Sequence, residues 1–154
     1  MRRAHAVKVS HYRISFTDSH PIFRSSVRRL KPPYRRFGGI LIDVFYDHLL
    51  ASHWDSFSAL PLPDFAADVY AGFEQYWNLI PEAARLRLQR MQTENWLCSY
   101  RETTGIATAL GRIGRRLQQP FDLAQSASLL EDDYSLFYAD FSAFYPELQA
   151  HVLK

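Results

Sequence analysis

The sequence predicts an all-α fold, a single helical domain of about six helices, on three observations. Apolar residues recur at helical spacing along most of the 154-residue chain. Most of the eight prolines fall where a helix would begin, a position at which proline is tolerated. Neither Asn-Gly nor Asp-Gly, the dipeptides typical of hairpin turns, occurs in the sequence. Apolar residues make up 47% of the chain, which is enough for one packed core.

Prolines and capping residues set the expected limits of the helices. We expect helices at about residues 19–30, 34–54, 63–79, 81–100, 105–117 and 122–144. Lys31-Pro32-Pro33 ends the first, and a linker with two prolines at residues 58–63 precedes the third. Glycines and alanines along residues 105–114 permit close packing of the fifth helix. Pro146 is expected to begin a last short turn.

The charges are unevenly distributed along the chain. Residues 1–36 contain ten Lys or Arg and one acid, whereas the other 118 residues contain eight Lys or Arg and fifteen acids. We therefore divide the chain into a basic N-terminal arm, residues 1–17, and a helical domain, residues 18–154. A segment this basic attracts anionic partners over about 8 Å at physiological salt. Nucleic acid, an acidic membrane surface or an acidic protein would fit, and a merely solvated basic surface is the alternative.

Several classes of protein are excluded by what the sequence lacks. The single cysteine, Cys98, excludes an internal disulfide framework and a cysteine-based zinc site. No apolar run approaches the roughly 18–20 residues of a membrane span, and residues 4–10 lack the apolar core of a signal peptide. Phosphate-binding glycine loops, nucleophile elbows and dinucleotide fingerprints are also missing. We expect a protein of the cytoplasm.

The most informative candidates for chemistry lie within the second expected helix. Asp43 and Asp47 are four residues apart, so a helix places both carboxylates on one face, where they repel each other. A cation, an arginine or a shared proton would relieve this repulsion. His48 follows at once, about 100° around the helix, and can reach the same site at its edge. The alternative is that Asp47 and His48 bond to neighbouring helices and bind no metal.

A second candidate cluster precedes the first expected helix. Asp18 and Ser19 stand just before Pro21, where side-chain oxygens cap free backbone N–H groups. His20 could serve as a ligand or as a proton carrier, because an ordinary histidine pKa near 6.5 suits both roles. For Asp18 the capping role is the alternative to a catalytic one.

These segments belong to a wider pattern that resembles a known family. The matching residues are Phe16-Thr17-Asp18-Ser19-His20-Pro21, Tyr34-Arg35-Arg36-Phe37-Gly38-Gly39-Ile40, Asp43-Val44-Phe45-Tyr46-Asp47-His48-Leu49-Leu50-Ala51 and Trp54, with weaker matches at Met91, Trp96, Tyr100-Arg101 and Phe144-Tyr145-Pro146. In this order they resemble the acyl carrier protein phosphodiesterase family over about residues 16–146. The block containing Asp47-His48-Leu49-Leu50, with its distal Trp54, is the most specific piece.

The resemblance implies an all-α fold distantly similar to HD-domain phosphohydrolases, a divalent metal and a reaction. The metal would be manganese, with magnesium as the second choice, held by Asp43, Asp47, His48 and Asp18. The reaction would be hydrolysis of the phosphodiester that joins 4′-phosphopantetheine to a serine of acyl carrier protein, with Asp47, His48 and His20 as catalytic residues. Acyl carrier proteins are acidic, so the docking residues would be Arg24, Arg28, Arg29, Arg35 and Arg36. No membrane and no specific nucleic acid is implied.

Residues 1–15 depart from the family pattern. Family members begin with a histidine-rich opening and a Gly-Asn…Asp segment, which have no counterpart here. We therefore expect an upstream segment to have been lost or replaced, which would remove metal ligands and impair activity. Two alternative functions follow: a catalytically inactive relative that only binds acyl carrier protein, and a non-specific nucleic-acid binder that uses the basic first 36 residues.

Overall fold

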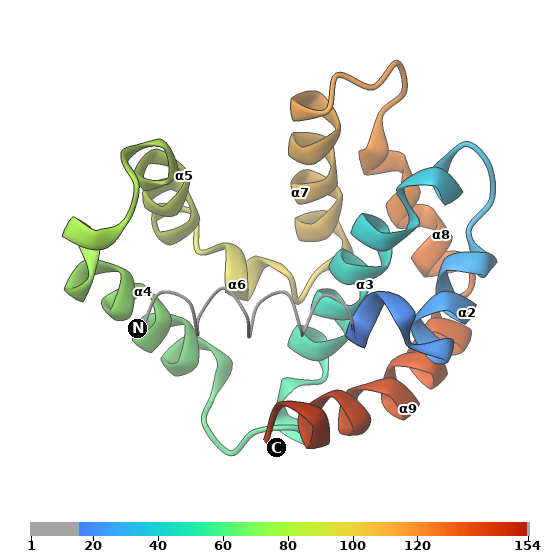
Figure 1. Ribbon diagram of the computed structural model, residues 1–154, viewed down its shortest axis with the longest axis horizontal. Coiled ribbons are helices and arrows are strands. Elements are labelled where there is room, and N and C mark those ends of the chain that lie inside the picture. The colour runs from blue at the N-terminus through green and yellow to red at the C-terminus, as the bar shows by residue number, and fades with distance from the viewer. Residues whose placement is uncertain (1–15, 154) are drawn as a thin grey trace. The chain divides into compact units, whose positions relative to one another are not determined.

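The computed structural model describes residues 16–153 and confirms the all-α class, since these residues form helices and turns (Figure 1). Residues 16–19 form a helical turn. The later elements are α2 (Pro21–Arg29), η1 (Tyr34–Phe37), α3 (Gly38–Ser52), η2 (Trp54–Ser56), α4 (Leu62–Gln75), η3 (Trp77–Leu79), α5 (Glu82–Thr93), α6 (Trp96–Ser99), α7 (Thr103–Arg116), η4 (Leu123–Ser126), α8 (Ala127–Asp132) and α9 (Tyr134–Val152). The basic arm, residues 1–17, lies outside the described residues except at its last two positions.

Four of the expected helices are divided into shorter elements, and two of these four contain more than one α-helix. The expected helix at 81–100 divides into α5 and α6 at Asn95, whose left-handed backbone (φ 49°) is incompatible with a continuing helix. The expected helix at 122–144 divides into η4, α8 and α9, with a break at Asp133. The described residues therefore form more and shorter helices than the six expected.

Pro146 does not begin a new turn, which corrects the sequence-based expectation. It lies inside α9, which continues to Val152. A proline within a helix removes one backbone hydrogen bond and costs about 3 kcal/mol. Phe137, Phe141 and Phe144 on the same helix are almost fully buried, and burying each such ring contributes about 1.5–3 kcal/mol. Packing of this face therefore offsets the missing bond, and the helix continues.

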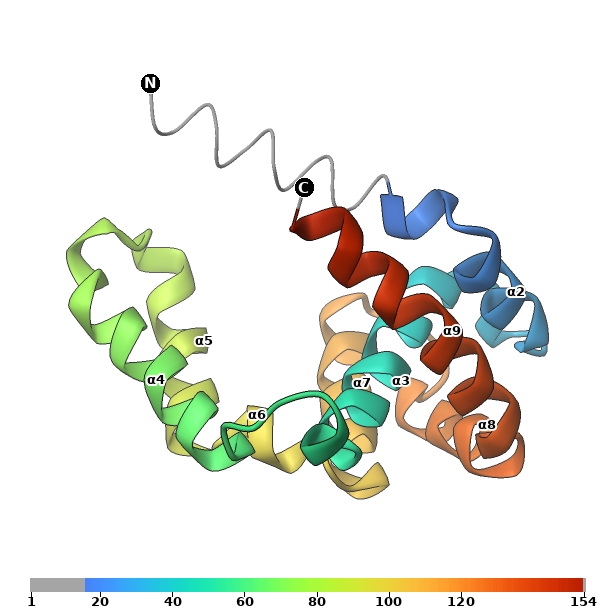
Figure 2. The same cartoon turned by 90° about the horizontal axis from the view of Figure 1, so that it is seen from below.

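The chain divides into two compact units, and α3 passes from one to the other. The first unit contains the described residues up to Tyr46 together with those from Gln125 onward, and the second contains residues 47–124. In the first unit α2 and α9 lie side by side (Figure 2). Its core is aromatic: the rings of Phe45 and Phe137 meet edge to face with centroids 5.4 Å apart.

A partly buried polar network also joins α2, α3 and α9 within the first unit. Ser26 Oγ donates to Asp140 Oδ2 at 2.8 Å, and Arg29 Nε donates to the same oxygen at 2.9 Å. The Tyr46 hydroxyl lies 2.7 Å from Ser26 Oγ. Burial is the main cause that raises the pKa of Tyr46 to about 12, so its hydroxyl stays protonated and donates to Ser26.

In the second unit, α6 links α4 to α7. The Tyr70 hydroxyl of α4 donates to Asn95 Oδ1 at 3.0 Å and accepts the Leu97 N–H at 3.2 Å, which fixes the start of α6. Gly105, in the first turn of α7, lies directly against the Ser99 carbonyl group at the end of α6. In the described part of the chain no helix is both long and apolar enough to cross a membrane.

Candidate functional site

Asp18 and Asp43 form an electrostatically coupled pair in the first unit. Asp18 lies in the turn before α2, and Asp43 lies on α3. The Asp43 side chain reaches the surface, but surrounding protein atoms partly desolvate its carboxyl group. This desolvation, and secondly the charge of Asp18, raise the pKa of Asp43 from 3.8 to about 6. The Asp18 carboxylate therefore lies near enough for its charge to act on the Asp43 carboxyl group.

We predict that replacing Asp18 with asparagine lowers the pKa of Asp43 without restoring it to 3.8, because desolvation is the larger cause. The raised pKa also means that deprotonation of Asp43 weakens the folded state as the pH rises from about 4 to about 6. Carbon-detected NMR titration of the Asp43 carboxyl group measures this pKa. An unchanged value in D18N would contradict the pairing.

The expected capping role of Asp18 and Ser19 is not what the structure shows. The N-cap of α2 is His20, whose Nδ1 accepts the Ile22 N–H at 3.2 Å. Its Nε2 donates to Glu147 Oε2 of α9 at 2.5 Å, and the ring packs edge-on against Phe144. The buried His20 ring joins two helices, because Nδ1 bonds to α2 and Nε2 bonds to α9. Its catalytic role stays a prediction.

Asp47 and His48 lie at the start of the second unit, one helical turn after Asp43 along α3. The Asp47 side chain is exposed, and it lines a cavity of about 120 Å³ together with Trp54, Leu62, Phe65, Leu97 and Tyr100, among others. This cavity is mostly apolar. A carboxyl group at its edge combines a polar group with an apolar recess, as small-molecule sites commonly do.

His48 is buried and oriented by the backbone. Its Nδ1 lies 2.8 Å from the Tyr100 carbonyl oxygen, which can only accept, so Nδ1 carries the proton. In the neutral ring the lone pair is then on Nε2. A backbone carbonyl that fixes the tautomer in this way is typical of histidines that bind metals.

The predicted docking arginines of the first unit differ in their surroundings. Arg24 and Arg28 line a groove of about 550 Å³ together with Asp18 and Gly39. Arg29 pairs with Asp140 at 2.9 Å, which neutralises much of its charge. Arg35 donates to the backbone carbonyls of Leu30 and Arg28, and Arg36 lies over the ring of Phe37. These partners carry no negative charge, so they do not neutralise either guanidinium group.

Sequence reasoning missed three features of the described structure. Two are the acids of α9, Asp140 and Glu147, which lie among buried phenylalanines at helical spacing. This spacing could have identified both, but the expected end of the helix at residue 144 hid Glu147. The third is a cluster of arginines between α5 and α7.

Within residues 16–153, no three His, Cys, Asp or Glu side chains gather as a metal-binding cluster.

Comparison with known proteins gives one consistent family. Residues 6–148 match the model of the family described as acyl carrier protein phosphodiesterase, a match that begins within the basic arm. The acyl carrier protein phosphodiesterase of Photorhabdus laumondii is 30% identical over 131 residues, which are 84% of this chain and 66% of that protein. The one of Yersinia pestis is 29% identical over 119 residues, 77% of this chain and 62% of that protein.

The chain thus spans less than two thirds of the length of these two relatives. A shorter relative, a putative acyl carrier protein phosphodiesterase of Shigella dysenteriae, is 28% identical over 141 residues, 88% of this chain and 96% of that protein. No solved structure matches the chain. The family match covers far more than half of the sequence, so the chain belongs to the acyl carrier protein phosphodiesterase family.

Proposed function

We propose that this protein hydrolyses the phosphodiester that joins 4′-phosphopantetheine to the serine of holo acyl carrier protein, releasing apo acyl carrier protein in the cytoplasm. The observation that carries the proposal is the family match over residues 6–148. The geometry adds support, because an exposed carboxylate, Asp47, lies at the edge of an apolar cavity.

The donor chemistry of the chain fits a hard divalent cation, manganese or magnesium. Asp18 and Asp43 would supply oxygen ligands, and a bound cation would relieve the repulsion between the two carboxylates. Asp47 and His48, the other two residues expected as ligands, lie in the second unit, and residues 16–153 hold no cluster of three such side chains, so their part in binding the cation stays a prediction. When bound, the cation supplies positive charge that offsets the negative charge developing on the phosphoryl oxygens.

The remaining steps fall to the chain's own residues. Asp47 is proposed to orient the attacking water and to accept its proton. The Tyr100 carbonyl accepts the Nδ1 proton of His48, which leaves the lone pair of the neutral ring on Nε2. The catalytic role of His20 stays a prediction, because its Nε2 would have to exchange the bond to Glu147 for one to the substrate. Arg24 and Arg28, which line the groove beside Asp18, are proposed to contact the acidic carrier protein.

The test is release of phosphopantetheine from holo acyl carrier protein by the chelator-treated chain, quantified by chromatography without added metal, with manganese and with magnesium. We expect release only when metal is returned. The control is carrier protein incubated with manganese alone. Equal release in the presence of chelator would contradict the metal requirement, and no release under any condition would contradict the hydrolysis.

A further inference from the structure

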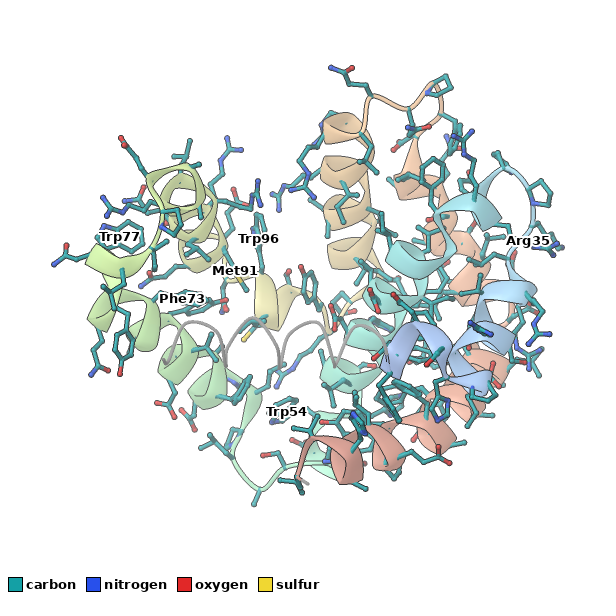
Figure 3. All side chains as sticks on the ribbon, viewed as in Figure 1. Arg35, Trp54, Phe73, Trp77, Met91 and Trp96 are labelled. Carbon is teal, nitrogen blue, oxygen red and sulfur yellow. The ribbon has the colours of Figure 1, made fainter. Side chains whose placement is uncertain are left out.

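A second basic surface, which we call the arginine cleft, lies between α5 and α7 above α6 in the second unit. Its volume is about 600 Å³. Five arginines line it: Arg87, Arg90, Arg112, Arg115 and Arg116. Trp96 rises from α6 into the space between α5 and α7 (Figure 3). No arginine of residues 16–36 is among the residues that line it.

The arginine cleft concentrates positive charge within an otherwise acidic unit. Residues 47–124 contain seven arginines and nine acids, yet five of these arginines line the cleft and no carboxylate does. Only Arg112 of the five forms an ion pair within the described residues, with Glu94. The other four are exposed or open to the cleft. Charges of one sign that line the same cleft add to one electrostatic potential, because the protein walls have a low dielectric constant. The cleft is therefore built to attract an anion.

The floor of the cleft is apolar and aromatic. Leu86 and Ile113 contribute aliphatic surface, and Leu86 is 69% exposed, a large value for a leucine. The Arg112 guanidinium lies over the Trp96 ring, 4.8 Å from its centroid, which occupies that face of the ring. A ligand that covers this floor must carry apolar groups as well as negative charge.

We propose that the arginine cleft docks an acidic, amphipathic helix of the carrier protein, an inference that rests on the proposed function. The two walls are long enough for such a helix, because α5 extends for about 18 Å and α7 for about 21 Å. Carboxylates along one side of the helix would meet the arginines, and its apolar residues would cover Leu86 and Ile113. A free phosphate would leave this apolar floor uncovered.

The position of Tyr100 connects this docking surface with the proposed chemistry. Tyr100 lines the arginine cleft, and it also lines the small apolar cavity that contains Asp47. Its backbone carbonyl holds His48. A carrier protein seated in the cleft would therefore lie beside Asp47 and His48 of the same unit, with Tyr100 as the wall between the two.

The test is a charge reversal with a matched control in the same unit. The double variant Arg87→Glu/Arg116→Glu reverses the charge at two exposed positions, one on each wall of the cleft. The control Arg85→Glu/Arg101→Glu makes the same change in charge outside the cleft. Affinity for apo acyl carrier protein is measured by calorimetry, since the apo form tests docking without the reaction. Release of phosphopantetheine from the holo form by the wild-type chain is measured in parallel, and circular dichroism verifies the fold of each variant.

We expect the cleft variant to lose about tenfold or more in affinity, the control to stay within about twofold, and wild-type binding to weaken with salt. An equal loss of affinity in both variants, or wild-type affinity in a folded cleft variant, would overturn the docking site. If the wild-type chain still hydrolyses the holo form in that case, the proposed function is unaffected. Displacement of the carrier protein by pyrophosphate or duplex DNA at lower concentration would also overturn it, in favour of those ligands. A wild-type chain that neither binds nor hydrolyses carrier protein contradicts both proposals.

Discussion

Replacing Asp47 with asparagine is expected to reduce the release of phosphopantetheine on the order of 10²–10⁴-fold, the usual effect of removing a general base. Asparagine keeps the size of the side chain but can neither accept a proton nor contribute negative charge to a cation. Asp47 is exposed on α3, so the fold should remain. Initial rates on holo acyl carrier protein with saturating manganese measure the effect, and circular dichroism verifies the helical content.

Asp68→Asn is the matched control for this variant. Asp68 is an exposed acid of α4 in the same unit and does not line the cavity that contains Asp47. We expect D68N to keep the wild-type rate, because the same loss of one negative charge then occurs away from the proposed site. Wild-type turnover by D47N would remove Asp47 from the catalytic residues.

Replacing Gly105 with alanine is expected to lower the free energy of unfolding by about 1–3 kcal/mol, as overpacking typically does. A methyl group at this position would overlap the Ser99 carbonyl oxygen and approach its carbon to 2.7 Å. Backbone atoms cannot rotate away as a flexible side chain can, so α6 and α7 must move apart. Urea denaturation followed by circular dichroism measures the change.

Gly72→Ala provides a control of opposite sign. Gly72 lies inside α4, and a methyl group there would meet no atom within 4 Å. Alanine at such a helix position is expected to raise the free energy of unfolding by about 0.5–1 kcal/mol, because glycine loses more backbone entropy on folding. Equal stability of G105A and G72A would contradict the close approach of α6 and α7.

The helices were predictable from the sequence where one local signal decides the structure. Pro21 and the apolar face that follows predicted α2 to within two residues, and Pro81 marked the start of α5. Local signals failed where tertiary packing or a single backbone angle determines the end of a helix. Asn95 has no proline or glycine beside it to predict a left-handed break. Pro146 is a strong helix-stop signal, yet burial of the aromatic face of α9 outweighs it.

The candidate site was predictable only in part, because residues that meet in space are often far apart in the sequence. Asp43 and Asp47 share a helix, so their spacing was sufficient to place them on one face. The partner of His20, Glu147, is 127 positions away and no local pattern links them. No pattern in the sequence distinguishes the arginines of α5 and α7 from those of an ordinary solvated helix face. Only the packing of both helices about α6 brings them to one cleft.

The central claim is that the chain removes the prosthetic group of acyl carrier protein. The most direct measurement is intact-mass spectrometry of holo acyl carrier protein after incubation with this chain, with and without manganese. We predict that the carrier protein loses the mass of 4′-phosphopantetheine when manganese is present and keeps it when metal is absent. An unchanged mass in the presence of manganese, with the chain shown to be folded, would contradict the hydrolysis and leave a family member that at most binds its partner.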